Sequence, residues 1–290
     1  MVLFISETLV GLSIGSRLFM IAVGLSLIFG VLNVLNFAHG VFYMLGAYVA
    51  ITVATTVVES FWVGALLGAL AVGVVGAVVE MGLIRRLYGR SEGELDQLIL
   101  TFSVVLIIDD LTRTIWGSSP RTVATPAALD FSVAVADTSI TAYRLFVIAA
   151  SVVVVVGLWL FLQRTHYGYL IRATSSDRDM AAILGVDVPR LYTAIFFLGS
   201  ALAGLGGALA APLQAVGPGL GNQVIIDAFV VVVIGGLGSL GGAFAGAMVI
   251  GLLQSFGVQL ISAGDLALPF LAMIAVLVFR PEGLFGGMDV

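Results

Sequence analysis

Residues 163–192 read QRTHYGYLIRATSSDRDMAAILGVDVPRLY and form the one long polar interruption in an otherwise almost continuously apolar chain. The segment holds four of the chain's twelve basic residues, all of which are arginine. A stretch with this much charge is stable in water, whereas its apolar neighbours are suited to lipid. The contrast predicts a membrane protein with a large aqueous loop at 163–192.

The composition of the chain also indicates a bilayer. Hydrophobic residues make up 60% and charged residues 10% of the sequence, with a mean hydropathy of +1.18, whereas a soluble domain carries about 25% charged residues. Lipid offers the backbone no hydrogen-bond partners, which favours helices over open sheets. We therefore expect an all-α fold: a polytopic transmembrane bundle of about 8–10 spans of roughly 20 residues, with discontinuous helices, in one domain covering residues 1–290.

Apolar windows define the expected spans, several of which are short or interrupted by glycine. Residues 2–16 fit either an interfacial helix or an additional short span. The windows are 18–34, 41–58, 61–84, 98–116, 145–162, 191–212, 224–237, 243–261 and 266–279.

The distribution of arginine predicts the orientation, because cytoplasmic loops carry an excess of basic residues. It predicts a cytoplasmic C-terminus and loop 163–192, an outer N-terminus, and a short outer cap at 117–143, where residues 131–135 alternate like a strand. The expected cytoplasmic group is Arg85, Arg86, Arg90, Arg164, Arg172, Arg178, Arg190 and Arg280, against Arg17, Arg113, Arg121 and Arg144 elsewhere.

Two regions break helix rules inside the expected membrane. One is GVLNVLNFAHGVFYMLGA at 30–47, and the other is IGGLGSLGGAFAGA at 234–247. Polar or glycine-rich backbone at this depth is tolerated only where protein or a water-filled path covers it, and discontinuous helices in both halves of a chain indicate a transport path. The glycine-rich stretch lacks a nucleotide-binding motif, so close helix packing is the better interpretation.

Polar residues in the first region are candidates for the substrate path. Spacings of three and four place Asn33, Asn36, His39 and Tyr43 on one face of a helix. The alternative is that they hold neighbouring helices together, with about 0.6–2 kcal/mol from each buried hydrogen bond.

Several carboxylates lie in or near the expected spans. Asp227 follows the loop AVGPGLGNQ at 215–223, so it either caps a helix N-terminus or lines the outer mouth of the path. Asp109 and Arg113 are four residues apart, which predicts a salt bridge. Glu80 is expected to reach Arg85 or Arg86 at the inner end of its helix.

The missing residue types exclude several activities. The chain has no cysteine and no lysine, so it offers no cysteine metal site, Walker lysine or Schiff-base lysine. We expect no cofactor and no catalytic residue in this chain, and ATP hydrolysis in another subunit. A membrane enzyme would need a paired acid and base that the sequence does not offer.

The second half of loop 163–192 is too apolar for a freely solvated loop, and a partner surface resolves this. Small alanines permit close approach, and glycine ends a helix. We expect Ala181, Leu184 and Gly185 to be buried in a partner surface, and the family resemblance described next implies that this surface is a cleft of an ATPase. The candidate coupling residues are Arg172, Asp177, Asp179, Met180, Ala181, Leu184 and Gly185.

Three blocks together resemble the permease subunits of branched-chain amino acid importers of the ATP-binding-cassette (ABC) class. They are GLSLIFGVLNVLNFAHGVFYMLGAYVA (24–50), RATSSDRDMAAILGV (172–186) and DAFVVVVIGGLGSLGGAFAGAMVIGLL (227–253), and the ending VLVFRPEGLFG (276–286) fits as well. The resemblance implies an inner-membrane subunit that works with a similar second permease, two ATPase subunits and an extracytoplasmic binding protein. The family's EAAxxxG docking motif reads Asp179, Met180, Ala181 and Gly185 here.

The leading interpretation is therefore a transmembrane permease subunit that moves branched-chain or related amino acids into the cytoplasm, with no nucleic-acid partner. A permease for a sugar, amide or urea is the alternative within the same class. A self-sufficient secondary transporter or channel is the alternative from another class, although it should carry its own coupling charge at the midplane.

Overall fold

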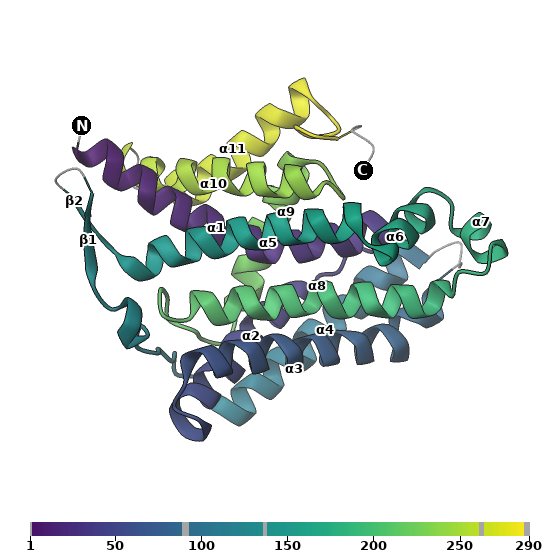
Figure 1. Cartoon of the computed structure of the whole chain (residues 1–290), viewed down its shortest axis with the longest axis horizontal. Helices are drawn as coiled ribbons and strands as arrows, with labels where there is room; N and C mark the ends of the chain where they lie inside the picture. Colours follow the sequence, from purple (N-terminus) through teal and green to yellow (C-terminus); the bar gives the residue numbers. More distant parts are fainter. Residues whose placement is uncertain (1, 89–92, 136–137, 261–263, 287–290) are drawn as a thin grey trace.

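The described chain, residues 2–88, 93–135, 138–260 and 264–286 of a computed structural model, is a bundle of helices (Figure 1). Every expected span falls on a helix, which confirms the polytopic helical fold. Among the described residues, six helices are long and apolar enough to cross a membrane. The helices at the expected spans are α1 (Val2–Leu32), α2 (His39–Thr52), α3 (Phe61–Gly82), α4 (Gly93–Trp116), α5 (Ala142–Arg164), α8 (Val188–Ala210), α9 (Leu220–Gly235), α10 (Leu240–Leu260) and α11 (Gly264–Phe279).

The short elements lie at the two ends of the bundle. Helices α6 (His166–Ser176) and α7 (Arg178–Ile183) occupy one end, whereas the N-terminus and the antiparallel hairpin of β1 (Ser132–Val135) and β2 (Thr138–Thr141) occupy the other (Figure 1). The strand-like alternation at 131–135 therefore does form a strand. The remaining elements are a π-helical turn at Val53–Val57 and 3₁₀ turns at Ile84–Leu87 and Ala127–Leu129.

The first helix begins sixteen residues before the expected span, at Val2 instead of Leu18. With 31 residues it is about 45 Å long, so residues 2–16 are neither an interfacial helix nor a separate span. Glycines allow this segment, which contains several polar residues, to pack within the bundle. Gly11 and Gly15 let α1 approach Leu252 and Ala247 of α10 closely. Backbone contact of this kind is how membrane helices pack without bulky side chains.

Small residues also fix the centre of the bundle. A Cβ at Gly46 of α2 would overlap the backbone of Gly204 in α8, and one at Gly207 would overlap the carbonyl oxygen of Tyr43. The glycine-rich stretch at 234–247 behaves in the same way, because Gly235 and Gly242 meet across the connection between α9 and α10. Close packing is thus confirmed as its role.

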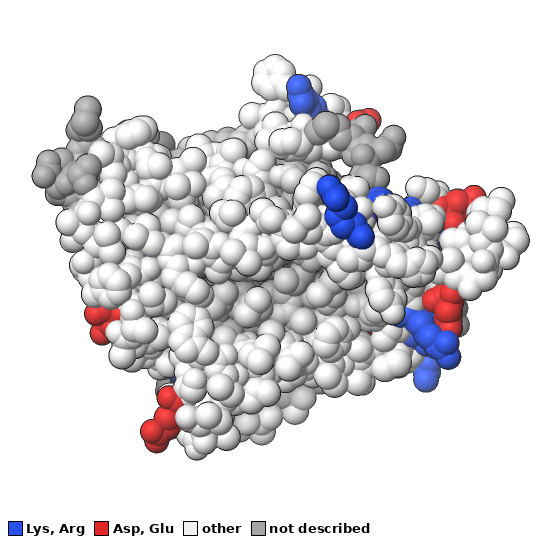
Figure 2. Space-filling model, viewed as in Figure 1, with Lys and Arg blue, Asp and Glu red and all other residues white. Residues whose placement is uncertain are grey.

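Charge is concentrated at the two ends of the bundle. Figure 2 shows the basic residues of this face mainly toward the end that carries α6 and α7, and the middle of the face almost without charge. Arg85 and Arg86 lie in the turn after α3, Arg164 ends α5, and Arg190 opens α8. These four arginines belong to the group that the sequence analysis assigned to the cytoplasm, whereas Arg90 of that group lies outside the described residues.

Candidate functional site

Helix α1 ends at Leu32 and α2 begins only at His39, so the polar stripe expected on one helix face is interrupted. Asn33 adopts a left-handed conformation with φ of 57°, and its N–H donates to Phe29 O at 2.9 Å. Asparagine tolerates this conformation better than other residues with a side chain, which is why the helix stops there. Asn33 is exposed and separate from Asn36, His39 and Tyr43, which are all buried.

Asn36 and His39 mark the start of α2. The side-chain oxygen of Asn36 accepts from Ala38 N at 3.0 Å, and its carbonyl oxygen accepts from His39 N at 3.2 Å. The amide nitrogen of Asn36 and both ring nitrogens of His39 make no hydrogen bond of good geometry within the described chain. Buried polar groups are nearly always bonded, so these three atoms are exceptions within the described chain.

The N-termini of α2 and α9 meet inside the bundle. A Cβ at Gly221 would lie 2.8 Å from Val41 Cα, and one at Gly40 would overlap Gly221 O. The rings of Phe37 and Phe229 pack beside this contact, with centroids 4.8 Å apart. Both helices therefore point their positive ends toward one region, which is the arrangement that discontinuous helices provide in transporters.

Asp227 does not cap α9, contrary to one of its two sequence readings. The helix begins at Leu220, after Gly219 with φ of 88°. Asp227 thus lies two turns inside the helix, where it is half-buried. The sequence analysis started this helix at residue 224 because Leu220–Gln223 belong to a glycine-rich, polar stretch, and tertiary packing of Gly221 overrides that local signal.

A polar chain that the sequence analysis missed crosses from α1 to α2. Arg17 Nη1 donates to Gln214 Oε1 at 3.0 Å, and Gln214 Nε2 donates to Tyr43 Oη at 3.3 Å. Arg17 lies at the midpoint of α1, and arginine at the centre of a spanning helix costs about 2.5–3.5 kcal/mol on insertion scales. The signal was hidden because the expected span began at Leu18, which left Arg17 outside the membrane.

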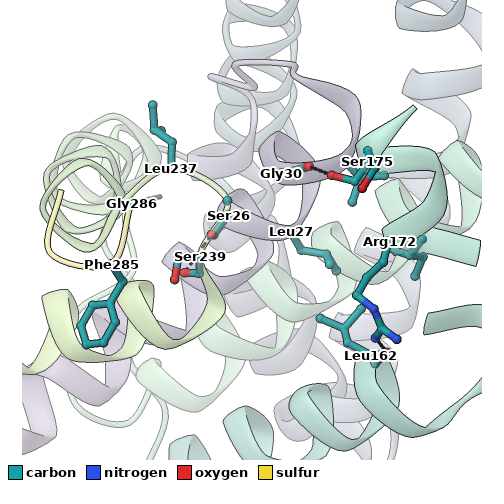
Figure 3. A pocket seen from close by; sticks show the side chains of 14 residues that line it. Ser26, Leu27, Gly30, Leu162, Arg172, Ser175, Leu237, Ser239, Phe285 and Gly286 are labelled. Carbon is teal, nitrogen blue, oxygen red and sulfur yellow. Dashed lines mark hydrogen bonds between the residues drawn. The ribbon is translucent and has the colours of Figure 1, made fainter. Parts of the chain in front are cut away.

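A cavity of about 520 Å³ opens at the end of the bundle that carries α6. Figure 3 shows Ser175 bonded to Gly30 on one wall and Ser26 bonded to Ser239 on the other, at 2.6 Å and 3.3 Å. Arg172 turns away from Ser175 toward the carbonyl oxygen of Leu162 and stacks on Tyr169, 4.8 Å from the ring centroid. Arg172 is therefore held against the bundle.

Helix α7 ends before Gly185, as the sequence analysis expected, and begins after Asp177, which was expected only as a coupling residue. Asp177 Oδ1 accepts from Met180 N at 2.9 Å and caps the N-terminus. Gly185 has φ of 91°, and Val186 N donates to Ala181 O at 3.0 Å, which is a glycine C-cap. Asp179 lies exposed in the first turn.

The outer surface of α7 differs from the expected contact set. Ala181 is only 3% exposed, so the chain itself covers it and the expectation that an ATPase cleft buries it is wrong. The exposed apolar residues are Met180 at 51%, Ile183 at 78% and Leu184 at 77%. Ile183 was missed because the sequence alone does not show which side of so short a helix faces the chain.

Two expected ion pairs are present. Arg113 Nη2 lies 3.0 Å from Asp109 Oδ2, and Arg85 Nη2 lies 3.0 Å from Glu80 Oε2. Glu80 is fully buried and also accepts from Thr193 Oγ1 at 2.7 Å. The Asp109–Arg113 pair lies within α4, and Asp109 also accepts from Gly219 N at 2.9 Å. Glu80 links α3 to α8 through Thr193.

The bundle, its interrupted helices and its buried polar groups define a multi-pass membrane transport protein. The family model "Branched-chain amino acid transport system / permease component" matches residues 8–278. The chain therefore belongs to this family of permeases of the cell membrane.

Relatives with the same description match nearly the whole chain. The high-affinity branched-chain amino acid transport system permease protein BraD of Pseudomonas aeruginosa is 28% identical, with 99% of this chain and 97% of the relative covered. The permease protein LivH of Escherichia coli K12 gives the same identity and coverage. The probable permease LivH of Methanocaldococcus jannaschii is 29% identical over 93% of this chain and 88% of its own length. No solved structure gives a significant match.

Proposed function

We propose that this chain is a transmembrane permease subunit of an ABC importer that moves branched-chain or related amino acids into the cytoplasm. The observation that carries the proposal is the family match over residues 8–278, which includes every candidate path and coupling residue. Relatives named for branched-chain amino acid transport support the substrate class. The chain acts with a second permease, two ATPase subunits and an extracytoplasmic binding protein, and ATP is hydrolysed outside this chain.

Helix α7 is the ATPase contact in this proposal. Met180, Ile183 and Leu184 present apolar side chains at the end of the bundle that we assign to the cytoplasm. Apolar residues exposed at a single tip are typical of an interaction site. Asp177 and Gly185 set the two ends of the helix, so they fix which side chains reach the ATPase.

The candidate substrate path runs past the meeting point of α2 and α9. Asn36, His39 and Tyr43 lie on its α2 side, Asn33 at its exposed edge and Asp227 along α9. ATP binding in the partner subunits would move α7 and rock the spans between states in which these groups face opposite sides of the membrane.

The test is ATP-dependent uptake of radiolabelled leucine into proteoliposomes that contain the assembled importer. Uptake that requires this chain, the ATPases, the binding protein and ATP, and that unlabelled isoleucine and valine inhibit, is the expected result. Uptake by this chain alone, without an ATPase, would instead identify a secondary transporter or a channel. Inhibition by a sugar, an amide or urea and not by isoleucine or valine would replace the substrate class.

A further inference from the structure

Among the described residues, Arg17 has no carboxylate partner. The ion pairs in the described part of the chain do not involve it. Its hydrogen bond goes to the neutral amide of Gln214, and its buried Nε atom has no partner. Because the guanidinium group stays protonated in proteins, α1 carries a positive charge at its midpoint that Gln214 cannot neutralise.

A second cation increases this charge. Arg144, near the start of α5, is one of the groups that act electrostatically on Arg17, and the other is the Tyr43 hydroxyl. Like charges repel each other, and a nearby anion lowers that repulsion. The positive field of Arg144 therefore adds to the preference of Arg17 for an anion.

The cluster of Arg17, Gln214 and Tyr43 lies on the side of the bundle where a solute would enter from outside. Gln214 belongs to the connection between α8 and α9, and Val216 of that connection pairs with Arg121 through two hydrogen bonds of 2.8 Å. Arg121 belongs to the segment that carries the hairpin, at the opposite end of the bundle from α6 and α7 (Figure 1). Tyr43 continues the cluster along α2 toward His39, one turn deeper.

We propose that Arg17, Gln214 and Tyr43 form a site for the carboxylate of the solute in transit, with Arg144 adding to its positive field. A guanidinium group binds a carboxylate through two parallel hydrogen bonds, and amino acids are the carboxylate-bearing class that the proposed function supplies. The inference rests on that function and adds to it the group that receives the substrate. The hydroxyl of Tyr43 and the amide of Gln214 then orient the bound carboxylate.

The substitution Gln214→Glu tests the site, because it places a permanent carboxylate beside Arg17. An internal anion competes with the substrate, so we expect leucine uptake by the assembled importer to fall at least tenfold while its unfolding temperature stays the same or rises. If Arg17 only supports the fold, the new ion pair leaves uptake unchanged. Gln163→Glu, the same change at the end of α5, is the matched control and should retain uptake within twofold.

A second measurement needs no variant. The wild-type importer is treated with phenylglyoxal, which modifies arginine, and the reaction at Arg17 is followed by mass spectrometry with and without leucine and binding protein. Protection of Arg17 by leucine, with Arg190 equally modified in both samples, is expected. Equal modification of Arg17 in both samples, or full uptake by the Gln214→Glu variant, overturns the site, whereas ATP-dependent uptake by the wild type would still support the proposed function.

Discussion

Arg17 lies at the midpoint of a membrane helix, whereas Ile183 and Leu184 are exposed at the tip of α7, on the side of the bundle that we assign to the aqueous cytoplasm. In both regions the polarity of the side chain differs from that of its surroundings: Arg17 is charged in an apolar region, and the α7 pair is apolar in water. An ionic ligand would stabilise the charge in the membrane. A protein surface would cover the apolar pair.

The two mismatches are similar in size. Placing an arginine at the centre of a spanning helix costs about 2.5–3.5 kcal/mol, and covering one leucine or isoleucine side chain releases about 1.5–3 kcal/mol. In each region, binding of the partner would therefore lower the free energy by several kcal/mol. This difference fits the two proposed roles, a site for a small solute in the inner region and a contact with a subunit at α7.

The largest effect is expected from Gly207→Leu in the membrane region. The new side chain would overlap the carbonyl oxygen of Tyr43, so its cost exceeds the about 1–3 kcal/mol of ordinary overpacking. We expect no monodisperse protein after membrane extraction, as measured by size-exclusion chromatography. Gly157→Leu on α5, where nothing lies within 4 Å of the added Cβ, is the control and should purify normally. Normal yield of the Gly207 variant would show that packing does not hold the inner region rigid.

The next largest effect is expected from Ile183→Asp at the tip of α7. An aspartate in an apolar contact should lower affinity for the ATPase by at least 2 kcal/mol, or about 30-fold, with the membrane fold intact. Co-purification and a binding isotherm with the isolated ATPase measure this. Val57→Asp, at a valine that is also well exposed (67%) and lies near the opposite end, serves as the control. Unchanged affinity would mean that the apolar tip of α7 is not the docking surface.

A smaller effect is expected from Asn36→Leu at the start of α2. The change removes the hydrogen bond to Ala38 N at a cost of about 1 kcal/mol and removes a polar group from the candidate path. We expect uptake to fall about tenfold while the complex assembles and hydrolyses ATP. Asn36→Asp keeps the acceptor and should assemble equally well. Loss of assembly in the leucine variant alone would favour a helix-packing role for Asn36.

The smallest effect is expected from Asp177→Ala. Loss of the cap to Met180 N should destabilise α7 by about 1 kcal/mol, because no other side chain caps that terminus. Amide hydrogen exchange should become about fivefold faster in α7 and remain unchanged in α8. Equal exchange in α7 would show that contacts with α6 and α8, and not its cap, keep the helix in place.

Local composition is enough to predict much of this protein. Long apolar windows predict the positions of the long helices, because a bilayer selects apolar helices wherever they occur. The i and i+4 spacing of Asp109 and Arg113 predicts their ion pair, since both residues lie on one helix. Gly185 likewise predicts the C-terminal end of α7, because a glycine cap depends on neighbouring residues.

Only the tertiary structure decides which of these residues meet. Arg17 and Gln214 are separated by 197 positions in the sequence and meet because the connection after α8 reaches the middle of α1. Ala181 is buried and Ile183 exposed because the bundle covers one side of α7. Composition acts on each segment by itself, whereas these contacts depend on close backbone approach at glycines far apart in the chain, such as Gly40 and Gly221. The sequence by itself thus determined a helical membrane permease, and helix packing decided where its buried charge and exposed apolar tip lie.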